Sequence, residues 1–372
     1  MSITVLSPGT QTTVQDLGRY GNAVWGLAHS GAMDRRAATI ANILVDNAEN
    51  AALLEFSTVG PSIRFDQNTV FSFTGARPQA TLDGKPVEGY KAIRARKGQV
   101  LSLGFCAQGV YGYLAFAGGL DVPLVMGSAS THVPCHIGGY KGRALEEGDR
   151  IELKAEVGDI PNLYGHFMKR DNYYNFGTPG VTYIRVVPGP HEHLFNKRGV
   201  EAFYNKVFVA TGKADRMSYY LNGQVVSTVG ETSDVMSDGV AFGSILIPSR
   251  GRPIVAMADR HTTSGVTKIG TVASIDLPLL VQRKANDLIR FQPISVYEAQ
   301  DLLREQRSFF DALRRDMRKP YLGEENTRGP AQRIAELMPE APTPKKGKSK
   351  MLASMYRNTD WKRATQGDLF RH

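Results

Sequence analysis

The sequence contains only two cysteines, Cys106 and Cys135, in 372 residues. Two cysteines are too few for a disulfide framework, and they lack the spacing of a zinc site. No uninterrupted apolar run approaches the roughly 20 residues that cross a bilayer, and the N-terminus lacks the basic and apolar segments of a signal peptide. We therefore expect a cytoplasmic protein with no membrane segment and no bound metal.

Glycine and proline are plentiful, with 38 and 19 copies. They separate many short alternating or apolar segments, which is typical of a β-barrel or β-sandwich and not of a parallel α/β sheet. The length predicts two domains. Both halves of the sequence end with a similar segment, "GDRIEL" at 148–153 and "NDLIRF" at 286–291. We expect an all-β fold with few helices: an N-terminal β-domain over 1–155, a linker over 156–180 and a second β-domain over 181–294.

Two segments show helical periodicity. Apolar residues recur at helical spacing over 34–46, where Ser30 or Asp34 is a candidate cap and free first-turn N–H groups could bind an anion. A second, amphipathic helix is expected over 295–319 with Ser295 as its cap. Asp83-Gly84 is a strong signal for a β-hairpin.

The net charge of +9 is concentrated at one end. Residues 341–372 carry eight Lys or Arg against two Asp, a net charge of +6, so the preceding 340 residues carry only +3. We expect 320–372 to be a disordered basic tail. Because such a run is usually a solvated end, nucleic-acid binding is not the favoured function.

The stretch "ADRHTTSGVTKIG", residues 258–270, places much polar chemistry between apolar flanks that are typical of buried strands. It could be a solvated hairpin tip or a site at the mouth of a β-structure. Donors and carboxylates of these types can polarise an amide and orient its N–H groups. The candidate catalytic residues are Asp259, Arg260, Thr262, Thr263 and Lys268, with His261 as a candidate substrate-binding residue.

Further candidates for substrate binding lie elsewhere in the chain. Asp215 and Arg216 form either a buried ion pair or a grip on a carboxylate or phosphate. Gln15, Asp16 and Arg19 lie beside glycines, where they either brace a turn or contact a ligand, and Ser30 is a cap or an anion contact. Two other motifs are weaker: the pair His191 and His193 lacks a third metal ligand, and Cys135 is only adjacent in sequence to His132 and His136.

Eight segments together resemble a known family, that of the biotin-dependent carboxyltransferases or allophanate hydrolase subunit 2. The family includes the KipA-type proteins, identified as the C subunit of ATP-dependent 5-oxoprolinase, and part of the carboxyltransferase domain of urea carboxylase. The resemblance covers residues 3–300 and rests on these segments: "TTVQDLGRYG", "SGAMDRRAATIANILVDN", "LAFAGGLDVPLVMGSAST", "GGYKGRAL", "VVPGP", "ADRMSYYLNG", "FGSILIPSRGRPIVAMADRHTTSGVTKIGTVASIDLPLL" and "IRF".

The resemblance implies two cyclophilin-like β-barrel domains and a KipI-like (allophanate hydrolase subunit 1 type) partner. It implies an ATP-dependent amidohydrolase subunit that opens a small lactam. ATP would be shared with partner subunits, since no Walker-type loop occurs here. One alternative is carboxyl transfer from carboxybiotin to urea or a urea-like acceptor, with biotin supplied by another protein because no Met-Lys-Met motif is present. Another is a non-catalytic regulatory binding partner.

The sequence departs from the family pattern at five positions within the candidate site region. We expect these departures to alter substrate choice or to leave a protein without turnover; they are Leu246, His261, Ser264, Val266 and Thr267.

Overall fold

A computed structural model describes residues 2–155, 163–169, 173–176, 180–230 and 233–319. The predicted basic tail, 320–372, lies outside the described residues, as does part of the predicted linker, 156–180. In the part of the chain that is described, no helix has the length and apolar character to cross a membrane.

The N-terminal half forms a nine-stranded sheet in the order β2-β3-β8-β4-β1-β9. The long strand β5 pairs with β8 and carries the short strands β6 and β7. Asp83 and Gly84 both have positive φ at the β5–β6 turn, so the predicted hairpin is confirmed. The strands are β1 Ser2–Ser7, β2 Gln11–Gln15, β3 Leu53–Ser57, β4 Ser62–Phe65, β5 Thr69–Leu82, β6 Lys85–Pro86, β7 Ile93–Ala95, β8 Val100–Phe116 and β9 Arg150–Glu152.

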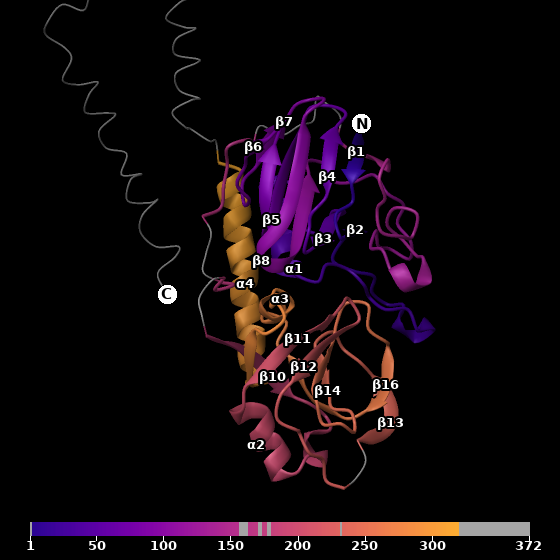
Figure 1. Ribbon diagram of the computed structural model, residues 1–372, viewed down its shortest axis with the longest axis vertical. Coiled ribbons are helices and arrows are strands. Elements are labelled where there is room, and N and C mark those ends of the chain that lie inside the picture. The colour runs from indigo at the N-terminus through magenta and orange to yellow at the C-terminus, as the bar shows by residue number, and fades with distance from the viewer. Residues whose placement is uncertain (1, 156–162, 170–172, 177–179, 231–232, 320–372) are drawn as a thin grey trace, which may run out of the picture. The chain divides into compact units, whose positions relative to one another are not determined.

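The C-terminal half closes into a barrel in the order β10-β17-β14-β15-β12-β11-β18. A two-stranded sheet of β13 and β16 stands beside it (Figure 1). The strands are β10 Val181–Pro188, β11 Phe208–Ala214, β12 Ser218–Asn222, β13 Asp234–Gly239, β14 Ser244–Leu246, β15 Ile254–Ala256, β16 Thr263–Val266, β17 Lys268–Val272 and β18 Leu288–Pro293. The prediction of a mostly β fold with few helices is therefore confirmed.

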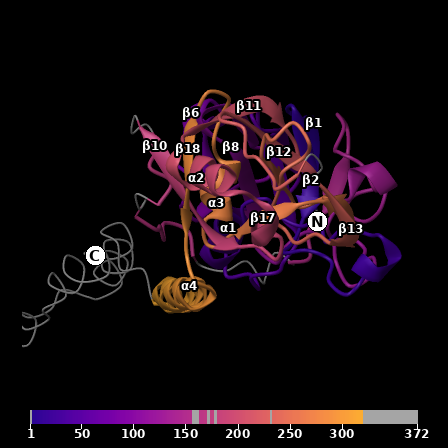
Figure 2. The same ribbon diagram turned by 90° about the horizontal axis from the view of Figure 1, so that it is seen from below.

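Both predicted helices are present with their caps. Helix α1, Arg35–Leu44, begins after Asp34, whose carboxylate accepts the N–H of Ala37. Helix α4, Val296–Met317, begins with a capping box between Ser295 and Glu298. Figure 2 shows α4 end on, standing outside the two sheets. The remaining helices are α2 Lys197–Asn205, α3 Leu277–Val281 and the 3-10 turns η1 Ala23–Trp25, η2 Val133–Cys135 and η4 Glu192–Leu194.

The prediction of a buried strand for the apolar flank that follows the 258–270 stretch, "TVASIDLPLLV" at 271–281, is wrong for its second half. Strand β17 ends at Val272, and "LPLLV" forms α3 instead. A short apolar run does not distinguish a buried strand from a buried helix, and Pro278 in the first turn favours the helix.

The two halves are joined at α3. The side chain of Gln282, just after α3, accepts the N–H groups of Val110 and Tyr111 at 2.8 and 3.1 Å and donates to the Tyr111 carbonyl at 2.8 Å. The Gln282 side chain thus forms hydrogen bonds with the backbone of β8, as a neighbouring strand would. Its amide also donates to Asp34 at 2.8 Å, which ties α1 to the same point. This junction fixes the barrel mouth against the N-terminal sheet.

Candidate functional site

A buried ion cluster bridges the two halves of the protein. Arg216, between β11 and β12, donates through Nε and Nη2 to both carboxylate oxygens of Asp259 at 2.8 and 3.1 Å. Its Nη1 binds Glu55 of β3, and Nη2 also donates to the Gly31 carbonyl at 2.8 Å. Burial acts to lower the pKa of Arg216, but the carboxylates of Asp259 and Glu55 outweigh it and raise this pKa.

The sheet register explains why Arg216 and Asp259 meet. Strands β12 and β15 pair side by side, with Ser218 opposite Ala256. The pairing extends past the strand ends, where the Asp259 N–H donates to the Arg216 carbonyl at 2.7 Å. Because both of its carboxylate partners are protein groups, Arg216 holds the two halves together. It is a buried ion-pair residue, but its partners are Asp259 and Glu55, whereas the sequence predicted Asp215.

Glu55 is a site residue that the sequence reasoning missed. Its second carboxylate oxygen accepts the N–H of Met33 at 2.8 Å and the hydroxyl of Tyr113 at 2.7 Å. Tyr113 faces Glu55 across the β3–β8 pair, and its oxygen accepts the Asp34 N–H at 2.6 Å. A lone acid inside the apolar run "ALLEFS" was the available signal, since an unpaired charge is rarely buried.

Arg260 is the second buried arginine at this junction. Its Nε donates to the Val240 carbonyl at 2.8 Å, and Nη1 lies 3.3 Å from the Met257 carbonyl. Its Nη2 lies 3.2 Å from Nδ1 of His29. Burial, then the charge of Arg35, lowers the pKa of Arg260 to about 10. The guanidinium is therefore charged at neutral pH, and its hydrogen-bond partners among the described residues are neutral groups.

His29 is the side chain that contacts Arg260 Nη2. Burial lowers the pKa of His29, and the charges of Arg260 and Arg35 lower it further. The imidazole is therefore neutral at neutral pH and can accept from Arg260.

The cluster around β2 braces a loop and also contributes to the junction. Asp16 accepts the N–H groups of Gly18 and Ala129, each at 2.7 Å, so its carboxylate is used for loop structure. Arg19 donates to the carbonyls of Val125 and Ser130, each at 2.9 Å. Asp16 thus braces the loop, whereas Arg19 Nη1 has no hydrogen-bond partner in the part of the chain that the structure describes.

Five side chains at this junction carry a buried polar atom that has no hydrogen-bond partner among the described residues. The atoms are Gln15 Oε1, Arg19 Nη1, Ser30 Oγ, Arg35 Nε and His132 Nδ1. Arg19 and His132 lie close enough to Asp259 for its charge to act on their pKa values. Such atoms cost free energy unless a ligand or other group satisfies them.

The remaining predicted site residues lie apart from this junction cluster. Lys268 is buried against Asp238 and His191, which form a separate polar group beside the barrel. Asp215 is exposed, and its carboxylate accepts the N–H groups of Met217 and Ser218 as a turn brace.

Residues 261–266 form the exposed part of the "ADRHTTSGVTKIG" stretch. His261 and Thr263 are exposed, and the Thr262 carbonyl accepts the N–H of Val240 at 2.9 Å. Thr263 and Ser264 belong to β16, which pairs with β13. The sequence predicts either a site or a solvated hairpin tip for this stretch, and each alternative describes a part of it. Asp259 and Arg260 belong to the buried junction, whereas the residues after them enter the β13–β16 strand pair beside the barrel.

The contacts at the start of α1 support the alternative in which Asp34 is a helix cap. Asp34 is fully buried and caps the helix, and its second oxygen accepts from Tyr174 at 2.7 Å and Gln282 at 2.8 Å. Burial raises the pKa of this carboxyl group. The Ala37 N–H of the first turn is thus already bound by this buried carboxyl group.

The weaker motifs do not form sites either. His191 lies at the start of a 3-10 turn and not on a strand. Cys135 is exposed whereas His132 is buried, so the two side chains face different surroundings. Among the described residues, no three His, Cys, Asp or Glu side chains gather as a metal site.

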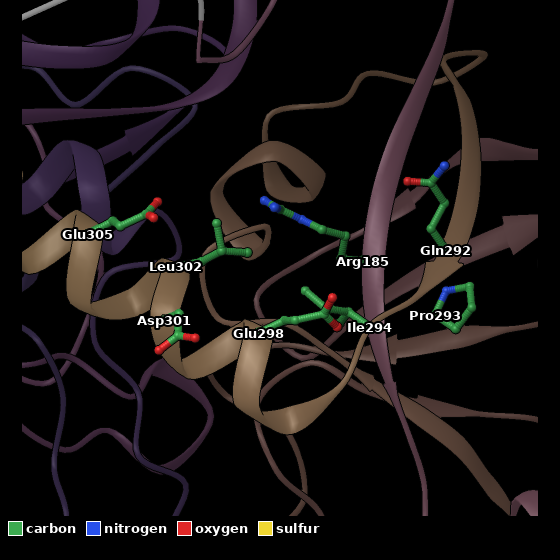
Figure 3. A pocket seen from close by; sticks show the side chains of 8 residues that line it. All are labelled: Arg185, Gln292, Pro293, Ile294, Glu298, Asp301, Leu302 and Glu305. Carbon is green, nitrogen blue, oxygen red and sulfur yellow. The ribbon is translucent and has the colours of Figure 1, made fainter. Parts of the chain in front are cut away.

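A pocket of about 610 Å³ lies between α4 and the strands β10 and β18 (Figure 3). Three of its four charged side chains, all but Glu305, have partners among the described residues. Arg185 donates to Asp276 at 2.9 Å, Glu298 belongs to the α4 capping box, and Asp301 binds Arg304. This pocket contains none of the predicted site residues, so the junction cluster is the better candidate.

Comparison with known proteins gives a consistent result. A family model described as "Carboxyltransferase domain, subdomain A and B" matches residues 25–293. The C subunit of 5-oxoprolinase from Haemophilus influenzae is 33% identical over 319 residues, which is 84% of this chain and 98% of that protein. The C subunit of 5-oxoprolinase from Escherichia coli is 34% identical over 312 residues, 83% of this chain and 96% of that protein.

The fold has a solved counterpart in a larger protein. The crystal structure of the K. lactis urea amidolyase matches with a TM-score of 0.76 and 27% identity over 84% of this chain. The match covers 20% of that protein, so this chain spans about a fifth of its length. The family resemblance seen in the sequence is confirmed: this chain belongs to the carboxyltransferase domain family with subdomains A and B.

Proposed function

We propose that this protein is a subunit of an ATP-dependent amidohydrolase of the 5-oxoprolinase type, which opens a small lactam together with a KipI-like partner subunit. The similarity supports this function, because two proteins named as the C subunit of 5-oxoprolinase match along 96–98% of their length. The larger urea amidolyase matches only through a fifth of its chain.

The structural observation that carries the proposal is the buried junction, in which one arginine binds two carboxylates and the other binds only neutral acceptors among the described residues. Opening a lactam breaks the ring C–N bond, joins a water oxygen to the carbonyl carbon and leaves a proton on nitrogen. Negative charge develops on the carbonyl oxygen, where buried preorganised donors stabilise it strongly. Arg260 is charged, buried and without a carboxylate partner among the described residues.

We assign a structural role to some residues of the junction and a substrate contact to Arg260. Arg216 positions Asp259 and Glu55 and is not itself a ligand contact, because its donors are bound. Arg260 would stabilise charge on the substrate oxygen, with His29 holding its orientation. Lys268, exposed Asp215, and the exposed side chains His261 and Thr263 would not take part in this chemistry.

The sequence contains no Walker-type loop that would bind the phosphates of ATP. The most suitable helix start, that of α1, is capped by the buried carboxyl group of Asp34. We therefore assign phosphate binding to the partner subunits, and this chain would contribute the lactam site.

The K. lactis match supports a second candidate function, carboxyl transfer to a urea-like acceptor. Carboxybiotin, attached to another protein, would supply the carboxyl group. A third, regulatory function would leave the junction without turnover.

Phosphate release by the purified full chain, with and without a KipI-like partner, tests the proposal. Stimulation by 5-oxoproline only in the complex is the expected result. Transfer of label from carboxybiotin to urea, without 5-oxoproline-dependent phosphate release, would favour the second function. A stable complex that is silent in both assays would favour regulation and refute the proposal.

A further inference from the structure

Five side chains at the junction contact one another in a closed circuit, which we call the Arg35 cluster. The rings of Tyr20 and His29 lie 5.0 Å apart, and His29 Nδ1 lies 3.2 Å from Arg260 Nη2. The guanidinium carbon of Arg260 lies 5.9 Å from the centre of the Phe242 ring, and that of Arg35 lies 5.4 Å from the same centre. Arg35 Nη1 donates to Tyr20 Oη at 2.6 Å, which closes the circuit.

The cluster draws its members from both halves of the protein. Tyr20 and His29 lie in the loop between β2 and α1, and Arg35 is the first residue of α1. Phe242 lies between β13 and β14, and Arg260 follows β15. Because each member contacts two others, the five side chains hold one another in place.

The Arg35 cluster is accessible from solvent. Tyr20 is 56% exposed, and His29, Arg35 and Phe242 are each partly exposed. Arg260 is the buried member, with 7% exposed. A small ligand can therefore reach Arg35 and His29 without the unfolding of any segment, and it would then lie within reach of the Arg260 charge.

The two arginines bring an excess of positive charge to the cluster. Neither forms an ion pair among the described residues: Arg35 donates to the Tyr20 hydroxyl, and Arg260 binds backbone carbonyls and His29. Burial, and then the charge of Arg35, lowers the pKa of Arg260, so the two guanidinium groups are close enough to repel each other. Contact with an aromatic ring stabilises a guanidinium but does not neutralise it.

The nearby carboxylates are already bound elsewhere. Asp259 is close enough to act on the pKa of Arg260, but Arg216 binds both of its oxygens. Arg216 also binds Glu55, so the ion cluster next to the Arg35 cluster contains two carboxylates and one arginine. The described residues therefore supply no anion to the Arg35 cluster itself.

The free polar groups of the cluster are hydrogen-bond donors. His29 Nδ1 accepts from Arg260, so the proton of the neutral imidazole lies on Nε2, which has no hydrogen-bond partner among the described residues. Arg35 uses only Nη1 for hydrogen bonds within the described chain, although a guanidinium has five N–H groups. Accessible donors beside excess positive charge match an oxygen anion, and not a cation or an apolar group.

We propose that the Arg35 cluster is a subsite for an oxyanion, a carboxylate or phosphate group carried by a small ligand. Arg35 binds two oxygens of this group through its guanidinium, His29 donates from Nε2, and the charge of Arg260 adds to the attraction. The subsite goes beyond the proposed function, because it requires neither a lactam nor a partner subunit. Arg35 thereby selects charged ligands over neutral ones of the same shape.

Calorimetric titration of the full chain at constant ionic strength tests the subsite. The probes are sodium acetate, sodium phosphate and acetamide, which has the shape of acetate without its charge. We expect acetate, phosphate or both to bind at one site per chain, and acetamide to bind at least 10-fold more weakly. Binding of acetate alone identifies the group as a carboxylate, and binding of phosphate alone identifies it as a phosphate. Binding of neither anion, or equal binding of acetate and acetamide, would overturn the proposal.

Arg35→Gln removes the guanidinium that contacts the oxyanion. We expect it to weaken anion binding at least 10-fold, with a Tm in chloride within about 2 °C of the wild type because Arg35 is partly exposed and forms no ion pair among the described residues. Arg94→Gln is the matched control: Arg94 of β7 also lies near a tyrosine ring, 6.0 Å from the centre of Tyr164, and has no ion pair among the described residues. Wild-type binding by Arg35→Gln would place the anion elsewhere, as on the basic segment 341–372, and would refute the subsite.

Arg35→Lys separates a positioned contact from net charge. Lysine keeps the positive charge but lacks the planar fork that binds two oxygens. We expect its affinity for the anion to lie between those of the wild type and Arg35→Gln. Saturating anion should also raise the Tm of the wild type and leave that of Arg35→Gln unchanged. Equal anion binding by Arg35→Lys and the wild type would refute the contact with the guanidinium.

These outcomes are distinguishable from a failure of the proposed function, because the titrations use the chain without a partner. If Arg35→Gln abolishes anion binding but the wild-type complex never releases phosphate with 5-oxoproline, the subsite stands and the function fails. If the complex is active but the chain binds neither acetate nor phosphate, the subsite fails and the function stands.

Discussion

Replacing Glu55 with glutamine should destabilise the protein more than any isosteric change at its surface. The substitution keeps size and shape but removes one of the two carboxylates bound to Arg216. Glutamine can still accept from Met33 and Tyr113 through its oxygen. Its NH₂ group would then face Arg216 Nη1, placing two donors against each other in a buried site.

The magnitude follows from the remaining contacts. Removing one member of a buried ion pair costs about 3–5 kcal/mol. Because Asp259 still binds Arg216 through two hydrogen bonds, we expect the lower end, about 3 kcal/mol. With an unfolding entropy of about 2.1 cal/mol/K per residue, a cooperative unit spanning Met1–Lys319 would lose about 4–5 °C in Tm.

Urea denaturation at pH 7, followed by tryptophan fluorescence and circular dichroism, measures this loss. The matched control is Asp301→Asn, which removes an ion pair with Arg304 whose two side chains are 66% and 72% exposed. We expect the control to change stability by less than about 0.5 kcal/mol. A loss below about 0.5 kcal/mol for Glu55→Gln would show that the junction cluster does not hold the halves together.

Two further predictions concern stability. Burial acts to raise the pKa of Asp149, but Arg143, 2.7 Å away, and the Glu146 N–H outweigh it and lower this pKa. A lowered carboxyl pKa stabilises the fold above about pH 4 and does so less as pH falls. Asp149→Asn should therefore cost about 1–2 kcal/mol at pH 7 and progressively less below pH 4 in pH-dependent urea melts, and a pH-independent cost would contradict this reasoning. Phe310→Ala should cost about 3 kcal/mol, because buried Phe310 of α4 belongs to the same apolar cluster as Ile40 and Leu44 of α1. A change under about 1 kcal/mol in the same melts would show that the Phe310 ring is dispensable for this packing.

Local signals in the sequence were sufficient to predict several elements. Ser295 and Glu298 have the spacing of a capping box, and Asp83-Gly84 that of a tight hairpin. These features depend on residues a few positions apart, so the chain's own sequence specifies them. The family resemblance then identified the two β-rich halves as a known pairing.

The composition of the junction could not be predicted in the same way. Glu55 is brought to Arg216 across 161 positions, and no local pattern encodes such a pairing. Lys268 lies ten residues from Ala258 in the sequence, yet the course of β16 carries it to Asp238 and His191. Sequence proximity therefore overestimated the extent of the site in this stretch, and it gave no indication of Glu55.

Helix α3 shows where the spacing of apolar residues cannot predict secondary structure. Its five residues are too few to show a helical repeat, and their apolar character suits either a strand or a helix. The contact of α3 with α1 and the position of Gln282 after it decide the outcome. Tertiary packing, and not propensity, places this element.

The most direct test of the central claim is 5-oxoproline-stimulated phosphate release by complexes assembled with wild-type protein, Arg260→Ala and the exposed control Arg304→Ala. Partner binding is measured in parallel by size-exclusion chromatography. We expect all three to assemble, Arg304→Ala to remain within 2-fold of wild type, and Arg260→Ala to lose about 100-fold or more of the stimulated rate. Wild-type stimulation in an assembled Arg260→Ala complex would contradict the assignment of lactam chemistry to the junction.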